Sequence, residues 1–403
     1  MSKSTTTPPQ AAKLTDQATL NAALAVLERF FDLSADGYVC QTRDLWQVLV
    51  SAAVQCSYIE TVCKDLATAP TSETVWGYVN DQLTPTVIRR LRGQCNRALA
   101  SQLPVWLWDH PKEVAFDLHD EAYYGTDDDP EDPECWICRG EARAGTTRFY
   151  RCATAYVMHK DVRFTLAVEF VRPGEDLIKV IKRLRRRVKT LGIKVKRYYL
   201  DKGFCTIPVL QGLMAEPTLA AILAAPIRGK VNGRGTRALC HGRKSYRTTH
   251  TFRSKEHGEL TVPVMVVRTL EKRRDGTRKW VWLVYVLLNE PHLTARQVRK
   301  AYRRRFGIES SYRLLEQVRG RTTARNAALR FLWMGIALVL GNIWIALHWK
   351  YLQRRGSGPR RVAREEFILP CLAKFLRRAI EAIYGVVSII DPPNVRPAKS
   401  GKY

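Results

Sequence analysis

The order of alternating and helical patterns between residues 113 and 226 constrains the fold of this chain most strongly. Apolar and polar residues alternate over 147–157 and 162–170, which predicts two strands, and the short link between them indicates a hairpin. A short apolar run at 114–116 ends at Asp117 and predicts an earlier strand. The next segments predict a helix over residues 175–191, a strand over 194–200, a helix over 206–214 and a strand over 219–226.

This order predicts an α+β or α/β fold built on an RNase H-like mixed sheet flanked by helices. In such a sheet an antiparallel three-strand meander is followed by parallel strand–helix units with right-handed crossovers. The predicted parts begin with a disordered lead-in (1–14) and a helical DNA-binding domain (15–110). The first part of the core (111–227) is followed by a basic β-rich insertion (228–290) and by the second part of the core, which holds the catalytic and buried helices (291–350). A basic C-terminal helix and tail (351–403) ends the chain.

The predicted N-terminal helical domain and the predicted insertion are both basic. Residues 15–107 follow a helical period and include a helix that carries Arg89, Arg90, Arg92 and Arg97, which fits DNA binding but also fits any helical accessory domain. The insertion begins with a basic, glycine-rich stretch at 228–255 that we interpret as flexible. Two apolar strands follow it, and Asp275 and Gly276 between them predict a hairpin turn.

Composition narrows the class of partner. The chain has 66 Lys and Arg against 38 Asp and Glu, a net charge of +28, which repels itself unless a polyanion shares it. Nucleic acid is the commonest such partner, and an anionic membrane surface is the alternative. The first residues lack the apolar segment of a signal peptide, and ten cysteines at irregular spacing indicate reduced thiols in a cytosol.

One uncharged run tests the membrane alternative. Residues 331–349 are just long enough to span a bilayer. The run contains Gly335, Gly341, Asn342 and His348, and basic residues flank it at both ends, so it lacks an orientation bias. We therefore expect a fully buried helix in a soluble core and no membrane partner.

Three carboxylates fall where the predicted topology can gather them. Asp117 and Asp201 end the first and fourth predicted strands, which are neighbours, and Glu309 lies on a later predicted helix that can cross them. Grouped carboxylates repel each other and need cations, and oxygen ligands suit Mg²⁺ or Mn²⁺. Two such ions can drive an in-line displacement at phosphorus. A single strand-end Asp could simply cap the next turn, but three acids at these places favour catalysis.

The stretch 301–316 strengthens this prediction. Tyr302, Arg305 and Glu309 stand at i, i+3 and i+7, which puts them on one face of a helix. With this spacing the chain resembles the DDE transposases of bacterial and archaeal insertion sequences, in the group with a β-strand insertion between the second Asp and the Glu. Segments 117–125 and 198–204 resemble the two aspartate regions of that group, so the resemblance extends over residues 110–350.

The resemblance implies nicking of DNA at the terminal inverted repeats of a transposon and transfer of the freed 3′-OH into target DNA. It implies two Mg²⁺ or Mn²⁺ ions held by Asp117, Asp201 and Glu309, a homodimer in the active complex, and a prokaryotic, cytoplasmic, nucleoid-associated protein. His119 and Asp120 would support the ligands. The candidates for DNA contact are Tyr302, Arg305, Arg313, Arg319, Lys202, Arg228, Lys230 and Arg234.

One position departs from the pattern of the group. A Lys is expected seven residues after the Glu, but Glu316 stands there. Arg313 or Arg319 can supply the missing positive charge, and Glu316 competes with Glu309 as the third ligand. Two other functions stay open: an RNase H-fold nuclease or resolvase that cuts without joining, and a catalytically inactive, domesticated DNA-binding derivative.

A second possible metal site lies in the first part of the core. Cys135 and Cys138 have the CxxC spacing of a zinc site, and Cys152 and His159 could complete it. The alternative is a local hairpin with free thiols.

Overall fold

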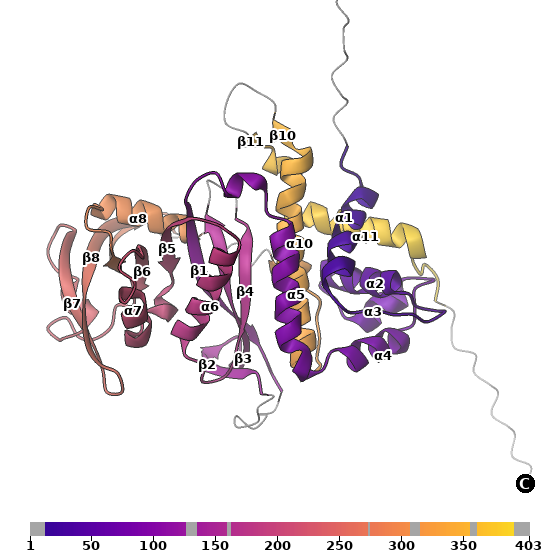
Figure 1. The fold of residues 1–403 in the computed structure, drawn as a ribbon, viewed down its shortest axis with the longest axis horizontal. Coiled ribbons are helices and arrows are strands. Elements are labelled where there is room, and N and C mark those ends of the chain that lie inside the picture. Colours follow the sequence, from indigo (N-terminus) through magenta and orange to yellow (C-terminus); the bar gives the residue numbers. More distant parts are fainter. Residues whose placement is uncertain are drawn as a thin grey trace, which may run out of the picture.

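A mixed β-sheet runs through the molecule and carries helices on both of its faces (Figure 1). The computed structural model describes residues 13–125, 135–158, 163–272, 275–306, 315–354 and 361–390. The strands of the sheet are β1 (Lys112–Ala122), β2 (Ile137–Arg143), β3 (Thr146–Met158), β4 (Thr165–Val171), β5 (Val195–Leu200), β6 (Ala221–Ala225), β7 (Tyr246–Ser254), β8 (Gly258–Lys272) and β9 (Arg278–Leu288). A separate small ladder pairs β10 (Gln353–Arg354) with β11 (Arg361–Val362).

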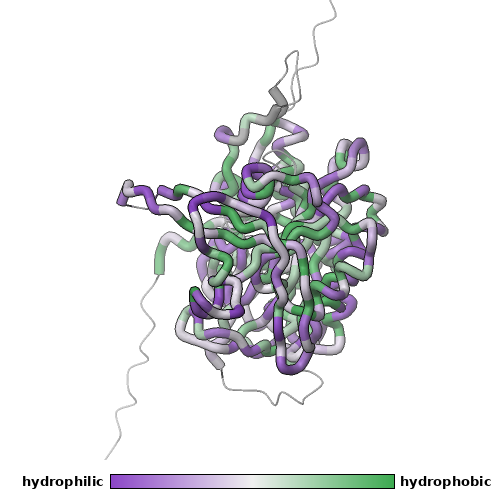
Figure 2. The backbone as a smooth tube through the Cα atoms, turned by 90° about the vertical axis from the view of Figure 1, so that its left-hand side faces the viewer, coloured by the Kyte–Doolittle hydropathy of each residue, from purple (hydrophilic) through white to green (hydrophobic). Residues whose placement is uncertain are grey.

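The core of the sheet has the predicted strand order and directions. β3 pairs antiparallel with both β1 and β4, whereas β1 pairs parallel with β5 and β5 pairs parallel with β6. The meander followed by parallel strands is therefore confirmed, together with the mixed sheet flanked by helices. In Figure 2, hydrophobic stretches of the backbone alternate with hydrophilic ones, and many hydrophilic stretches lie at turns on the outline of the molecule.

The insertion extends the sheet instead of folding apart from it. β9 pairs antiparallel with β6, β8 pairs with β9, and β7 pairs with β8. The basic stretch at 228–255 was expected to be flexible, but its last part forms β7. Backbone pairing along the whole of β7 to β8 explains this difference, because a ladder can order a polar segment that has no strong pattern of its own.

The helices are α1 (Asp16–Phe30), α2 (Thr42–Val54), α3 (Ile59–Asp65), α4 (Ser72–Gln82), α5 (Ile88–Ser101), α6 (Leu177–Thr190), α7 (Ile207–Met214), α8 (Ala295–Arg303), α10 (Ala327–Tyr351) and α11 (Leu369–Tyr384). Short 3₁₀ turns lie at Pro85–Val87, Val105–Leu107, Lys202–Phe204, Thr236–Leu239, Arg304–Phe306, Glu316–Val318 and Arg364–Glu366.

Side-chain alternation on β1 separates the two faces of the sheet. Val114 and Phe116 belong to the apolar core under α6 and α7, whereas Ala115 packs with Tyr302 and the rest of α8 on the opposite face. Residues that share the parity of Ala115, including Asp117, therefore lie on the α8 face.

α5 and α10 stand side by side between the sheet and the remaining helices of the N- and C-terminal parts (Figure 1). α10 contains the uncharged run and is long and apolar enough to span a membrane, but 78% of its most apolar window is buried inside the structure. This agrees with the buried core helix that the sequence predicted.

Asparagine side chains complete the outer edge of β4. Asn96 of α5 accepts a hydrogen bond from the backbone N–H of Val168 and donates to its C=O, each at 2.9 Å. Asn342 of α10 makes the same pair of bonds, both 2.9 Å, with Thr165. The polar residue inside the apolar run thus pairs backbone groups that a buried strand edge would otherwise leave unsatisfied.

Candidate active site

Asp117 and Asp201 follow the last parallel pair of the two central strands. Phe116 of β1 pairs with Leu200 of β5, so both aspartates are the next residues on neighbouring strands. Asp117 was predicted at the end of its strand, but β1 continues to Ala122 because it remains paired with β3, where Asp117 lies opposite Thr154. The strand-end description holds only for Asp201, after which the 3₁₀ turn Lys202–Phe204 begins.

Arg305 joins the two aspartates. One of its terminal nitrogens lies 2.8 Å from Oδ1 of Asp117, and the other lies 3.4 Å from Oδ1 of Asp201. The Arg305 side chain is 1% exposed and that of Asp117 is 9% exposed, whereas that of Asp201 is 34% exposed. A buried guanidinium requires such partners, because leaving either charge alone in the interior is costly.

Tyr302 contacts the end of β5 from the α8 face of the sheet. Its hydroxyl donates a 3.0 Å hydrogen bond to the C=O of Leu200, the residue before Asp201, and its ring packs near Tyr199 and Tyr285. Burial raises the pKa of the Tyr302 hydroxyl, so it stays a neutral donor. α8 is thereby fixed on the end of β5.

These positions differ from the expectation that Tyr302 and Arg305 face DNA. Both side chains are buried here, and their polar ends contact the sheet. α8 ends at Arg303 and a 3₁₀ turn carries Arg305, so the predicted continuous helix changes its winding before Glu309. Glu309 and Arg313 lie outside the described residues, and their predicted roles stay predictions.

The Asp117 face of β1 carries a row of acids that are each paired with arginine. Glu113 contacts Arg197 and Arg304, and Glu121 contacts Arg319 and Arg330. The site predicted from the sequence did not include Glu113, Glu121 or Arg330. A signal was present, because acids at positions 113, 117 and 121 share one face of any strand that extends beyond 117.

His119 lies on this face between Asp117 and Glu121, with Nε2 3.4 Å from a terminal nitrogen of Arg319. Burial, aided by the positive charge of Arg319, lowers the pKa of His119 to about 4, so the imidazole is neutral at pH 7. Asp120 points to the other face of β1 and pairs with Arg143 and Arg151. His119 thus shares the face of the aspartate site, and Asp120 does not.

Four of the predicted DNA-binding residues gather near the edge of the sheet where β5 and β6 end. Lys202, Arg228, Lys230 and Arg234 are all exposed. Arg228 and Arg234 line an open cleft between the start of α7 and the inserted β7–β8 hairpin, together with Phe252. Lys202 is the residue next to Asp201, whereas the cleft with Arg228 and Arg234 opens on the face of the sheet that α7 covers, opposite α8.

The donor set suits a divalent metal ion. Asp117 and Asp201 present hard carboxylate oxygens that already share one cationic partner, Arg305. Within the described ranges, no three His, Cys, Asp or Glu side chains gather closely enough to hold a metal ion. The exposed Glu316 lies in the 3₁₀ turn Glu316–Val318 and makes no such group with the two aspartates.

The cysteine pair is buried beside β3. Cys138 lies on β2, and its S–H donates to the C=O of Val171 at 3.5 Å. Burial raises the pKa of the Cys138 thiol to about 11, which favours the protonated form over the thiolate that zinc binds. Cys135 and Cys152 are buried too, and His159 lies outside the described residues.

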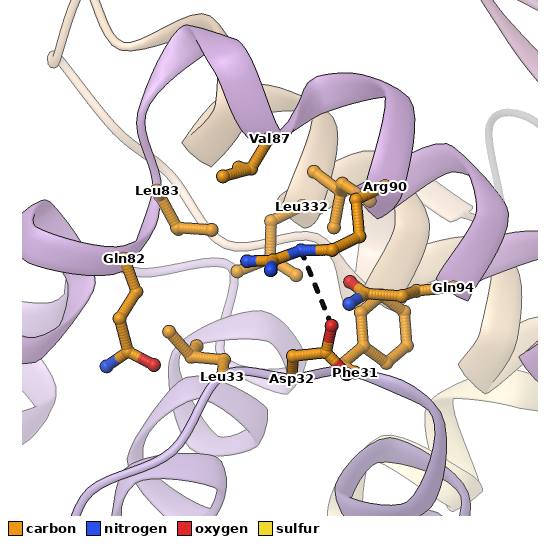
Figure 3. A pocket seen from close by; sticks show the side chains of 10 residues that line it. Phe31, Asp32, Leu33, Gln82, Leu83, Val87, Arg90, Gln94 and Leu332 are labelled. Carbon is orange, nitrogen blue, oxygen red and sulfur yellow. Dashed lines mark ion pairs between the residues drawn. The ribbon is translucent and has the colours of Figure 1, made fainter.

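The arginines of the N-terminal helices are partly engaged inside the protein. Arg92 pairs with the buried Glu169 of β4 at 2.8 Å. Arg90 pairs with Asp32 at 3.4 Å across a small pocket that Gln94 and Leu332 of α10 also line (Figure 3). Because Asp32 and Arg90 pair with each other in this pocket, the pocket suits packing between the helices.

No protein-family model and no curated protein matches the chain. Among solved structures, it is similar to a piggyBac transposase in a synaptic complex with hairpin DNA, with a TM-score of 0.47 and 12% sequence identity. The similarity covers 91% of this chain and 76% of the other.

Proposed function

We propose that this protein is a DNA transposase that cleaves DNA strands with the help of divalent metal ions and joins the freed ends to target DNA. The observation that carries the proposal is the placement of Asp117 and Asp201 side by side on parallel strands with one shared cationic partner. The net charge of +28 supports a polyanionic substrate.

Asp117 and Asp201 would hold Mg²⁺ or Mn²⁺, with Glu309 as the proposed third ligand and two ions in the full site. When bound, such ions activate an attacking hydroxyl group and stabilise charge on the leaving oxygen. Arg305 balances the two carboxylates from the α8 side. Tyr302 fixes the backbone from which Asp201 projects, through its bond to Leu200.

The protein's own cations would position the DNA. Lys202 is exposed next to Asp201, and Arg228, Lys230 and Arg234 are exposed along the loop that follows β6. Contacts of this kind to phosphates set the register of DNA without reading its sequence. They would present a backbone phosphate to the carboxylate pair.

The proposed reaction begins with water-driven nicking at terminal inverted repeats and continues with attack by the 3′-OH on target DNA. A homodimer would pair the two ends. Transposition within the cytoplasm of a prokaryote, at the nucleoid, belongs to the same proposal. The motif around Tyr302, Arg305 and Glu309 supports it, as does the inserted β7–β9 unit between Asp201 and that motif.

A strand-transfer assay tests the proposal against a nuclease or resolvase. The substrate is a pre-cut DNA end from the element that encodes the protein, carrying a free 3′-OH, with a supercoiled plasmid as target. We expect joined products with Mg²⁺ or Mn²⁺, and none with EDTA or with Glu309→Ala. Cleavage of uncut ends without any joined product would favour the nuclease, and DNA binding without cleavage would favour the inactive derivative.

A further inference from the structure

A second hollow lies at the C-terminal end of β1, apart from the cleft that Arg228 and Arg234 line. It is lined by Tyr58 from the start of α3, by Glu121 and Tyr124 from the end of β1 and the residues after it, and by the segment 316–325. The helical N-terminal part, the sheet and the segment before α10 therefore meet around one open space.

The charges of this hollow are unevenly satisfied. Glu121 at its floor is paired with Arg319 at 3.5 Å and Arg330 at 3.1 Å. Arg321 and Arg325 also line the space, and both are exposed without an ion-pair partner among the residues the structure describes. The exposed Glu316 lines the hollow as well, so among the described residues four arginines face two acids, and this balance favours an anionic occupant.

The segment that presents these arginines is irregular but held in place. The N–H of Arg321 donates to the C=O of Ser57 at 2.9 Å, and the hydroxyl of Tyr150 donates to the C=O of Arg325 at 2.9 Å. The guanidinium of Arg330 donates to the C=O of Ala324 at 2.9 Å. The arginine backbones are therefore positioned before any ligand arrives, which lowers the entropic cost of binding.

The hollow and the aspartate pair share one face of β1. Asp117 and Glu121 lie four residues apart on the strand, a distance of about 13 Å. Since one strand of duplex DNA carries a phosphate every ~3.4 Å of axis, the near rim of the hollow lies about four base pairs from the aspartates.

We propose that this hollow binds the phosphate backbone of duplex DNA about four base pairs from the reacting phosphate, through Arg321 and Arg325. The inference rests on the proposed function, because Asp117 sets the position of the reacting phosphate. Exposed aromatic side chains, Tyr58 and Tyr124, flank the arginines and leave room for a broad ligand such as a duplex.

The first test measures binding of a 30-base-pair duplex of mixed sequence over a range of salt concentrations. Arg321→Ala with Arg325→Ala should weaken binding by about tenfold or more, and should make the negative slope of log K against log salt shallower by about two. The matched control removes two exposed cations from α1 and α11, as Arg29→Ala with Lys374→Ala, and should leave both quantities close to wild type. Wild-type affinity and slope in the Arg321/Arg325 variant, or a preference for single-stranded RNA over the duplex, would overturn the inference.

The second test locates the contact. Neutral methylphosphonates are placed singly along the cleaved DNA end, and their effect is expected about four base pairs from the cut in wild type and absent in the Arg321/Arg325 variant. If Asp117→Asn abolishes cleavage while the Arg321/Arg325 variant binds DNA as wild type does, the proposed DNA contact at the hollow is refuted and the proposed function stands. If wild type cleaves no DNA but the salt slope is still shallower in the variant, the proposed function fails and the DNA contact stands.

Discussion

Arg305 occupies the place where the two aspartates would otherwise face each other without a counter-charge. Its guanidinium is 1% exposed and lies 2.8 Å from Asp117 and 3.4 Å from Asp201. An arginine so enclosed neutralises both carboxylates in the absence of metal, through a hydrogen-bonded ion pair with Asp117 and a longer ion pair with Asp201. A divalent cation entering this pair would then take over part of the role that Arg305 has.

Replacing Arg305 by Gln should therefore destabilise the metal-free protein and increase its response to metal. Loss of one partner of a buried ion pair costs about 3 kcal/mol or more, and the buried Asp117 is left uncompensated. In thermal unfolding we expect a lower Tm in EDTA, with a larger upward shift on adding Mn²⁺ than wild type shows. Arg304→Gln is the matched control, because Arg304 is 51% exposed and its bond to Glu113 is worth at most about 1 kcal/mol. Equal metal-induced shifts in wild type and Arg305→Gln would contradict this account.

At the residue scale, the sequence predicted that Asp117 and Asp201 lie on neighbouring strands, but it did not predict the environment of Arg305 and Tyr302. The placement of the two aspartates could be predicted because each follows a short apolar run in the sequence. The burial of Arg305 depends on where α8 packs across the sheet, which is a contact between residues 188 positions apart. Helical spacing shows which side chains share a face, but it does not show whether that face meets DNA or protein.

At the element scale, α10 serves both as core and as the cover of a strand edge. Its apolar side chains pack against α5 and the sheet, while Asn342 pairs with both backbone groups of Thr165 on β4. The polar residues inside the run 331–349 were an argument against a membrane span. The structure gives the reason for one of them, since Asn342 replaces the neighbour strand that β4 lacks.

Replacing Asn342 by Ala should destabilise the protein by about 2–3 kcal/mol, because the N–H and C=O of Thr165 lose their partners while still buried. Urea unfolding measures the free energy, and hydrogen exchange should show faster exchange at the Thr165 amide than at Val168, whose partner Asn96 is intact. Asn80→Ala, an exposed change on α4, should remain within about 0.5 kcal/mol of wild type. Unaltered stability and exchange in Asn342→Ala would show that the edge of β4 needs no such cover.

The inserted strands illustrate what local patterns can and cannot predict. The β8–β9 hairpin was predicted from two apolar runs around Asp275 and Gly276, and the pairing of Lys272 with Arg278 confirms it. β7 and the joining of β9 to β6 were not predicted. Both depend on backbone pairing between strands, which the polar residues of β7 do not signal.

At the scale of the whole molecule, cations and carboxylates lie at the edge of the sheet where the parallel strands β1, β5 and β6 end. Lys202 and Arg228 follow the ends of β5 and β6, Arg321 lines the hollow at the end of β1, and the two aspartates lie on β1 and directly after β5. Cations at several places along this edge would suit contacts to the phosphates of duplex DNA. A small-molecule hydrolase would need an enclosed pocket around the aspartates instead.

Mg²⁺-dependent cleavage of a supercoiled plasmid that carries the element and its flanking DNA tests the central claim most directly. We predict that Asp117→Asn and Asp201→Asn each lower the cleavage rate by at least about 100-fold, because metal coordination supplies several kcal/mol of transition-state stabilisation. Both variants should bind the plasmid as tightly as wild type, and Asp109→Asn, an exposed acid before the start of β1, should cleave normally. Cleavage at the wild-type rate after loss of both aspartates would contradict the assignment of this site.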